Sequence, residues 1–326
     1  MRIRFDHKSL TKGAQRFRFY IDNAVQYIIP NVFYRARLKG MMRHASVEER
    51  NAAMQRAAYY VKLPVGSSVG SNGTSVGDFR FPFHQKHKFT TYFFDLYDVL
   101  RYFHTALRFN YVFGDIERPI IEPSFVKARS ITDEPSNGAI MKLNQVRHFR
   151  FISHDKPFSV KKNMVVFRNV VNRQPQRYLL LEKFHDHPLC DVGQVNANPE
   201  HPEYVKPFMP IDEQLEYKFI CCIEGHDVAT NLKWVMSSNS LAVMPEPTME
   251  SWFMEGKLIA DYHYVKVKPD YSDMIAKVEY YATHREEAEQ IIHHAHEWVK
   301  MFQDQRQERL TELLTAEQYF KQTEQL

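Results

Sequence analysis

The 326-residue chain has few cysteines and glycines, three and eleven, and no hydrophobic run long enough for a membrane-spanning helix. Cys221 and Cys222 are adjacent in an apolar run, and with Cys190 they cannot form a network of disulfides, which indicates a reducing compartment. A bilayer span needs about 18 consecutive apolar residues, and the first residues lack the apolar core of a signal peptide. We therefore expect a cytoplasmic protein.

Over most of the chain, positive and negative charges nearly balance. The net charge is +4, with 44% hydrophobic and 14% aromatic residues, which excludes disordered, collagen-like and coiled-coil chains. Residues 1–50 are the exception, with 11 Lys and Arg against 4 Asp and Glu. This asymmetry indicates a local anionic partner, either a phospholipid surface or a nucleic acid.

The basic N-terminal segment has helical periodicity. Within residues 13–40, Phe17, Tyr20 and Tyr27 recur at helical spacing among arginines, and Pro30 interrupts the pattern, which predicts a broken amphipathic helix. Such a helix fits a membrane surface or an acidic substrate, but the same pattern is typical of a helix that packs on a core. A nucleic-acid-binding module is a further alternative, which the lack of a helix-turn-helix or RNP-like motif disfavours.

Short apolar runs alternate with helical patterns along the rest of the chain. We predict helices at 47–62, 91–109, 176–184 and 284–326, a glycine-rich loop at 66–77, and strands at 111–114, 125–131, 139–143, 164–168, 218–223, 240–244 and 263–267. Such alternation predicts an α/β fold with mostly parallel strands. At roughly 150 residues per domain, the length favours two domains.

The densest candidate site is the strand, glycine turn and helix start over residues 218–234. Candidate caps and cations of that helix are Asp227, Thr230, Asn231 and Lys233. The free N–H groups at a helix start favour a phosphate, so this segment is a candidate nucleotide site. Many α/β turns look similar, and an ordinary structural turn stays open as the alternative.

Basic residues and one acidic residue follow other predicted strands. Arginine suits a diphosphate because its planar fork bonds two oxygens at once, and Lys127, Arg129, Arg147 and Arg168 all lie at strand ends or in the connections between them. Asp115 closes another strand, where a carboxylate can act as a general base. Surface ion pairs and a turn aspartate are the structural alternatives.

Metal and hydrolase chemistry are disfavoured. No Cys-x-x-Cys is present, and neither group of potential ligands has a zinc spacing, which leads us to expect no metal. The two groups are His185, His187, Cys190 and Asp191, and His293, His294 and His296. G-x-S-x-G occurs only within the predicted glycine-rich loop at 66–77, without the strand and helix start of a nucleophile turn, which disfavours acyl-transfer hydrolysis.

Seven stretches between residues 91 and 303 occur in the same order as the motifs of a known protein family. They are TYFFDLYDVLRYF, FGDIERP, PSFVKARSI, MKLNQVRHF, VVFRN, KFICCIEGHDVATNLKWVMSSNSLAVMPEPTMESWFMEGKL and HYVKVKPDYSDM. Together they resemble glycosyltransferase family 90, above all its bacterial lipopolysaccharide branch. The block 218–273 carries most of the resemblance. It implies a GT-B architecture, with two Rossmann-like domains facing across a cleft, and an inverting transfer from a UDP-sugar that needs no metal or other cofactor.

The resemblance also implies roles for single residues. Asp115 matches the proposed catalytic base, and Glu250 the carboxylate that holds the ribose hydroxyls. Donor-binding positions are implied for Arg129, Arg168, Gly225, Asp227, Thr230, Asn231, Lys233 and Glu250. Eukaryotic members have an arginine where this chain has Asn231, so the other cations should meet the charge of the diphosphate.

The resemblance divides the chain into an acceptor-side domain at 1–155, a UDP-sugar domain at 156–300 and a helical tail at 301–326. It implies transfer of glucose or galactose, from UDP-glucose or UDP-galactose, to a lipid-linked core oligosaccharide of lipopolysaccharide. The enzyme would work at the inner face of the cytoplasmic membrane, where its basic N-terminal segment would meet anionic phospholipid. A catalytically inactive member that only binds a sugar nucleotide is the remaining alternative, and no nucleic-acid partner is expected.

Overall fold

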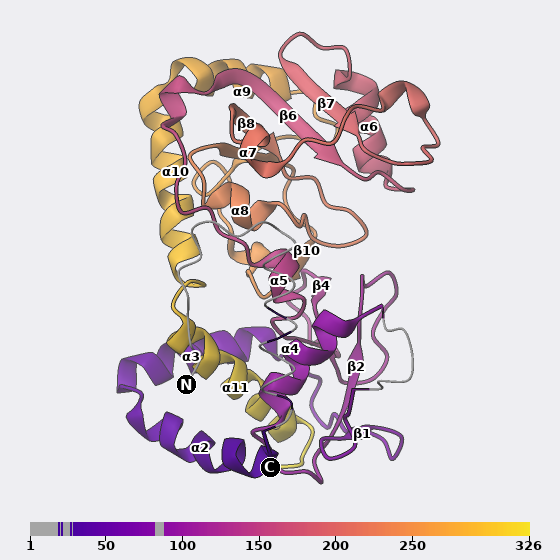
Figure 1. Ribbon diagram of the computed structural model, residues 1–326, viewed down its shortest axis with the longest axis vertical. Coiled ribbons are helices and arrows are strands. Elements are labelled where there is room, and N and C mark those ends of the chain that lie inside the picture. Colours follow the sequence, from indigo (N-terminus) through magenta and orange to yellow (C-terminus); the bar gives the residue numbers. More distant parts are fainter. Residues whose placement is uncertain (1–18, 20, 22–26, 28, 82–87) are drawn as a thin grey trace.

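The computed structural model describes residues 19, 21, 27, 29–81 and 88–326. Figure 1 shows two parts, one above the other, each containing a sheet. We call the lower one, made of residues 29–150 and the last helix, the N-terminal part, and residues 158–300 the C-terminal part. Among the described residues, no helix is both long enough and apolar enough to cross a membrane.

The N-terminal sheet has the strand order β1-β2-β3-β5. Its strands are β1 (Thr74–Ser75), β2 (Arg108–Val112), β3 (Ser124–Val126) and β5 (Gly138–Ile140). The last three are parallel, and β1 runs antiparallel to β2. The helices of this part are α2 (Asn31–His44), α3 (Val47–Tyr60), α4 (Thr90–Leu100), α5 (Gln145–His148) and α11 (Gln305–Gln322).

The C-terminal sheet consists of five parallel strands in the order β11-β9-β8-β6-β7. They are β6 (Lys162–Asn169), β7 (Cys190–Gln194), β8 (Tyr217–Cys221), β9 (Leu241–Met244) and β11 (Val265–Lys266). Around them lie α6 (Pro175–Phe184), α7 (Ile211–Gln214), α8 (Leu232–Met236), α9 (Met274–Thr283) and α10 (Arg285–Lys300), with short 3-10 turns at Phe158–Val160, Pro202–Tyr204 and Glu255–Lys257. The chain leaves β6 for β7 on one side and returns to β8 on the other. The switch point, where open α/β sheets bind ligands, therefore lies at the carboxyl ends of β6 and β8.

Besides the chain segment at 151–157, two further connections join the parts. The strand β10 (Met249–Ser251) leaves the C-terminal part and pairs antiparallel with β4 (Ala128–Ser130). After α10 the chain turns, and α11 returns to pack against α3 and α4 (Figure 1). A buried cluster closes this region: Trp252 stacks on Tyr60 with 4.0 Å between ring centroids, and its indole N–H donates to Glu308 of α11.

The mixed α/β fold with parallel strands is as predicted, and the helices expected at 47–62 and 176–184 are α3 and α6. Ser46 and Glu49 explain the start of α3, because the side chain of each accepts a hydrogen bond from the backbone N–H of the other. The first part of the broken helix expected over 13–40 falls mostly outside the described residues. Its last part is α2, which begins directly after Pro30.

The bounds expected for three elements were wrong, and one of the missed strands is β7. The helix expected over 91–109 ends at Leu100, because the chain then turns to enter β2, and the helix expected over 284–326 is divided into α10 and α11 by the turn between the parts. The strand expected at 125–131 is interrupted at Lys127, since β3 and β4 pair with different partners. The strand β7 was missed because its sequence, CDVGQ, lacks an apolar run.

Candidate active site

Lys127, at the break between β3 and β4, joins two segments that are far apart in the sequence. Its ammonium nitrogen lies 2.7 Å from Oδ1 of Asp115, which follows β2, and 2.6 Å from Oδ2 of Asp227, in the turn after β8. The Lys127 side chain is only 3% exposed. The structure therefore brings the predicted base and the predicted donor turn to the two sides of one buried cation.

The two carboxylates differ in their access to solvent. The side chain of Asp115 is 42% exposed, whereas that of Asp227 is 6% exposed. Burial raises the pKa of Asp227, and the nearby charge of Asp115 adds to this effect. Burial also tends to raise the pKa of Asp115, but the ion pair with Lys127 and the charges of Arg147 and His226 lower it overall. Asp115 is thus the accessible carboxylate, ionised at neutral pH, and able to accept a proton.

The turn after β8 is held by its own backbone and by α6. The N–H of Gly225 donates to the carbonyl of Asp227, and the Asn231 amide donates to the carbonyl of Cys221. A Cβ at position 225 would come within 3.0 Å of the Arg177 guanidinium, so glycine permits this close approach. The predicted caps are wrong: α8 has five residues and no side-chain cap, because the Asn231 side chain is used within the turn.

Two cavities lie at the carboxyl ends of the C-terminal strands. The first, which we call the apolar cavity, has a volume of about 310 Å³ and lies beyond β8 and β9. Its lining is mostly apolar, and includes Val228, Leu232, Met244, Pro245 and Tyr271. Three of its polar lining groups are Gln176, Glu224 and Glu255. A largely apolar pocket with few polar groups is typical of a small-molecule site.

The second, the arginine cavity, has a volume of about 680 Å³ and lies at the switch point between β6 and β8. Four arginines line it: Arg147, Arg150, Arg168 and Arg177. The two cavities adjoin at the start of α6, where Gln176 lines the first and Arg177 the second. A ligand that extends across both would meet an apolar surface at one end and cations at the other.

Backbone carbonyls hold the Arg177 side chain in place. Its guanidinium donates to the backbone carbonyls of Val170, Ile223 and Glu224. Within the described residues it has no carboxylate partner, and burial lowers its pKa to about 10. A buried cation that is fixed by neutral acceptors favours an anion beside it.

The predicted donor-binding residues fall into two groups. Arg168, Thr230 and Asn231 line the arginine cavity, and Gly225 and Asp227 lie in the turn beside it. Of these, Arg168 forms an ion pair with Asp191.

Arg129, Lys233 and Glu250 line neither cavity, which differs from the expectation. Arg129 and Glu250 form a buried ion pair at 2.9 Å across β4 and β10, and Lys233 is buried against Glu255. These partners supply the counter-charges that burial demands. Donor contacts by these three residues stay a prediction.

Sequence reasoning missed Arg177 and Glu255. Arg177 lies in the first turn of α6, directly after the strand at the switch point, so the strand order would have indicated it. Glu255 lies five residues after Glu250, and it rather than Glu250 lines the apolar cavity.

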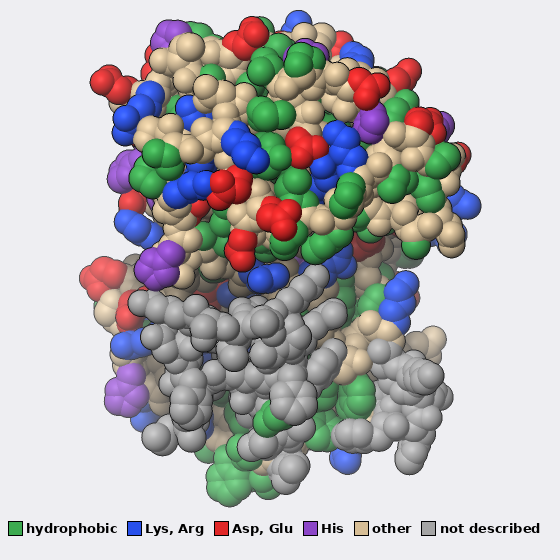
Figure 2. All heavy atoms as spheres, turned by 45° about the horizontal axis from the view of Figure 1, so that its top comes forward, with side chains coloured by type: hydrophobic (Ala, Val, Ile, Leu, Met, Phe, Trp, Pro, Cys, Tyr) green, Lys and Arg blue, Asp and Glu red, His purple; other side chains and the backbone are tan. Residues whose placement is uncertain are grey.

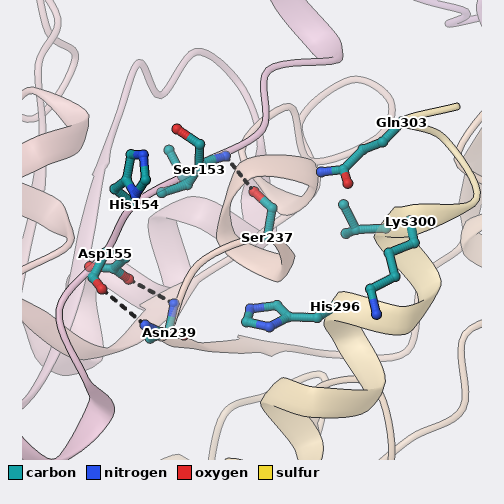
Figure 3. Close-up of a pocket in the computed structure, with 10 residues that line it drawn as sticks. Ser153, His154, Asp155, Ser237, Asn239, His296, Lys300 and Gln303 are labelled. Atoms are coloured by element: carbon teal, nitrogen blue, oxygen red, sulfur yellow. Dashed lines mark hydrogen bonds between the residues drawn. The ribbon is translucent and has the colours of Figure 1, made fainter. Parts of the chain in front are cut away.

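A third cavity, of about 400 Å³, lies on the segment that links the two parts and contains none of the predicted site residues. Figure 3 shows Ser153, His154 and Asp155 on one side of it, and His296, Lys300 and Gln303 from α10 and the following turn on the other. Asp155 is hydrogen-bonded to Asn239, and the N–H of Ile152 donates to Ser237. These bonds fasten the link between the parts to the C-terminal sheet.

The sequence matches the family description "Glycosyl transferase family 90" over residues 142–318. It is also 37% identical, over 309 residues, to a protein of Dichelobacter nodosus described as "O-glucosyltransferase LpsA", an alignment that covers 94% of this chain and 95% of the relative. The chain belongs to glycosyltransferase family 90. A shorter similarity, 33% over 132 residues, links it to the uncharacterized protein 179R of Invertebrate iridescent virus 6, covering 38% of this chain and 10% of that protein.

The family 90 match includes both walls of the arginine cavity, since it begins just before α5 and continues through the C-terminal sheet to α11. Asp115 and Lys127 precede the matched range. The bridge from Asp115 through Lys127 to Asp227 therefore connects a segment outside the family match to one inside it.

Proposed function

We propose that this family 90 protein transfers a hexose from a UDP-sugar to a lipopolysaccharide core saccharide, with inversion at the anomeric carbon. The observation that carries the proposal is the Lys127 bridge, which places the accessible Asp115 beside the turn at Asp227. In the GT-B architecture that we propose, the N-terminal and C-terminal parts are the two Rossmann-like domains. Their shared cleft would contain the arginine cavity, because α5 forms one of its walls and α6 to α8 the other.

The donor fits across the two cavities. The apolar cavity would take the nucleoside, with Glu255 and Gln176 facing its hydroxyl and amide groups. The diphosphate would then reach the arginine cavity at Arg177, whose fixed guanidinium can bond two phosphate oxygens. Thr230 and Asn231 border the same place.

The chemistry requires one base and a stabilised leaving group. Asp115 would take the proton from the acceptor hydroxyl while that oxygen attacks the anomeric carbon and the bond from this carbon to the diphosphate breaks. The departing UDP carries the negative charge, which Arg177 and the neighbouring cations would stabilise from the opposite side. The arginines could thus fill the role that a divalent ion has in other enzymes, and we expect transfer without an added metal ion.

The hexose and the membrane contact are the finer parts of the proposal. The name of the Dichelobacter nodosus relative favours glucose over galactose. On α2, Val32 and Phe33 are 54% and 60% exposed, and Arg37 and Arg43 are also exposed, which fits a peripheral contact with anionic phospholipid at the inner face of the cytoplasmic membrane. By contrast, acidic and basic side chains are interspersed on the face of the C-terminal part seen in Figure 2.

The donor is tested by the melting temperature of the protein with a panel of nucleotide sugars. Ligands that bind only the folded state raise this temperature, so UDP, UDP-glucose and UDP-galactose should raise it, whereas ADP- and GDP-sugars should not. Equal shifts with all nucleotides, or none with the uridine compounds, would contradict the donor assignment. For the membrane contact, reversing the charges of Arg37 and Arg43 should weaken binding to vesicles that contain anionic lipid, and unchanged binding would exclude α2.

A further inference from the structure

The arginine cavity holds more positive charge than its carboxylates neutralise. Of its four arginines, only Arg168 has an ion-pair partner within the part of the chain that the structure describes, namely Asp191. The side chains of Arg147 and Arg150 form no hydrogen bond or ion pair with any residue that the structure describes, and the Arg177 guanidinium donates only to backbone carbonyls. Asp212, on α7, is the single carboxylate among the described lining residues.

The arginines without an ion pair among the described residues come from both parts of the molecule. Arg177 belongs to α6, at the carboxyl end of the C-terminal sheet, where the diphosphate of the donor is proposed to bind. Arg147 lies on α5 and Arg150 just after it, on the side of the N-terminal part. A donor diphosphate at Arg177 would neutralise the charge of that guanidinium. The positive charges of Arg147 and Arg150 would still lack a counter-ion among the described residues.

Arg147 also lies near the candidate base. Its positive charge contributes to lowering the pKa of Asp115, and it repels the charge of Arg177. An acceptor sugar whose hydroxyl is at Asp115 would thus come near the charge of Arg147, and Arg150 lines the same cavity as Arg147. Arg147 is exposed and Arg150 is half-buried, which suits a substrate that enters from outside.

We propose that Arg147 and Arg150 form an anion-binding subsite for the acceptor, and that the enzyme selects saccharides with a negative group near the accepting hydroxyl. The inference rests on the proposed function, since it assigns the acceptor of that same site. Phosphate and carboxylate share the chemistry that the guanidinium fork recognises, two oxygens in one plane. The acceptor is then held at its charged group as well as at the hydroxyl that reacts.

The test measures binding and transfer separately. The variants Arg147→Gln and Arg150→Gln, singly and combined, are compared with Arg285→Gln, which removes an exposed arginine on α10 outside the cavity. The probe is deacylated core oligosaccharide, either intact, treated with phosphatase, or with its carboxyl groups reduced. We expect the combined variant to bind the intact acceptor at least tenfold more weakly by calorimetry, and its KM to rise equally, while Arg285→Gln matches the wild type.

The treated acceptors identify the charged group. The treatment that removes it should weaken binding to the wild type by the same factor and abolish the difference between wild type and variant. Arg147→Lys and Arg150→Lys should restore part of the affinity, because they keep the charge without the fork.

Other outcomes overturn the inference. Equal acceptor affinity in wild type and variants would remove the subsite, and a parallel loss of UDP affinity would assign these arginines to the donor diphosphate instead. If no nucleotide sugar supports transfer, the proposed function fails, but the calorimetric comparison still decides the subsite. Binding of the acceptor that depends on the two arginines would sustain it, and no binding at all would overturn it.

Discussion

Replacing Asp115 by Asn tests the candidate base. The amide has the size of the carboxylate, and its oxygen can still accept a hydrogen bond from Lys127, now 2.7 Å from Asp115. Lys127 also keeps its ion pair with Asp227 at 2.6 Å, so the donor turn should stay in place. The change therefore removes the proton acceptor and little else.

The expected loss is in turnover. A positioned general base contributes about 10²- to 10⁴-fold to a rate, equivalent to roughly 3–5 kcal/mol of activation free energy. We expect Asp115→Asn to lower kcat by about this factor and to change the Kd for UDP less than about threefold, because the uridine and diphosphate contacts that we propose lie on the C-terminal wall. Initial rates with a labelled UDP-sugar and calorimetry with UDP give the two quantities, and Asp186→Asn, at a 97% exposed carboxylate, is the matched control.

The pH profile gives an independent check. The pKa of Asp115 is lowered from its ordinary value of 3.8, so the base form persists as the pH falls through the neutral and mildly acidic range. Wild-type kcat should thus show no acid limb between pH 5 and 8 that belongs to this carboxylate. Near-normal turnover in Asp115→Asn, or a loss of UDP affinity as large as the loss of rate, would refute the assignment.

Three further predictions concern stability and donor binding. Replacing Asp191 by Asn should lower the free energy of unfolding at pH 7 by about 2 kcal/mol, because its pKa falls from 3.8 to about 2 on folding. Since the folded-state pKa is the lower one, this difference should be lost as the pH falls from 4 to 2, and a constant difference in urea unfolding would contradict it. Replacing Glu308 by Gln should cost about 3–5 kcal/mol in the same assay, because it leaves Arg56 and Lys142, each 2.6 Å away, buried without their counter-charge. Replacing Arg177 by Gln should weaken UDP binding by about 1.5–3 kcal/mol in calorimetry, and unchanged affinity would move the diphosphate elsewhere.

Local sequence patterns predicted those helices and strands that are determined by residues close together in the chain. The helix α3 follows from the reciprocal bonds of Ser46 and Glu49, and β8 from the apolar run that begins at Phe219, in a strand that is buried along its whole length. Alternation of such elements was enough for the α/β class. The strand β7 was not predicted, because its burial results from pairing with β6 and its own composition does not indicate a buried strand.

The site was predictable in its chemistry but less so in its partners. Asp115 and Asp227 were both candidates, yet the cation that joins them is 12 residues from the first in the chain, and only the fold brings it against the second. Conversely, Arg129 and Glu250 seemed suited to a donor, but their pairing over 121 residues of sequence is fixed by the contact of β4 with β10. A sequence shows which charges exist, whereas burial and topology decide which of them neutralise one another.

The position of α11 has a consequence for biosynthesis. Arg306 contacts Glu49 across 257 residues of sequence, and the last helix covers the buried face of α3. During translation the apolar surface of α3 therefore emerges from the ribosome long before the residues that will cover it, and it stays open while the whole C-terminal part is made. A nascent chain at that stage is a natural client for a ribosome-associated chaperone.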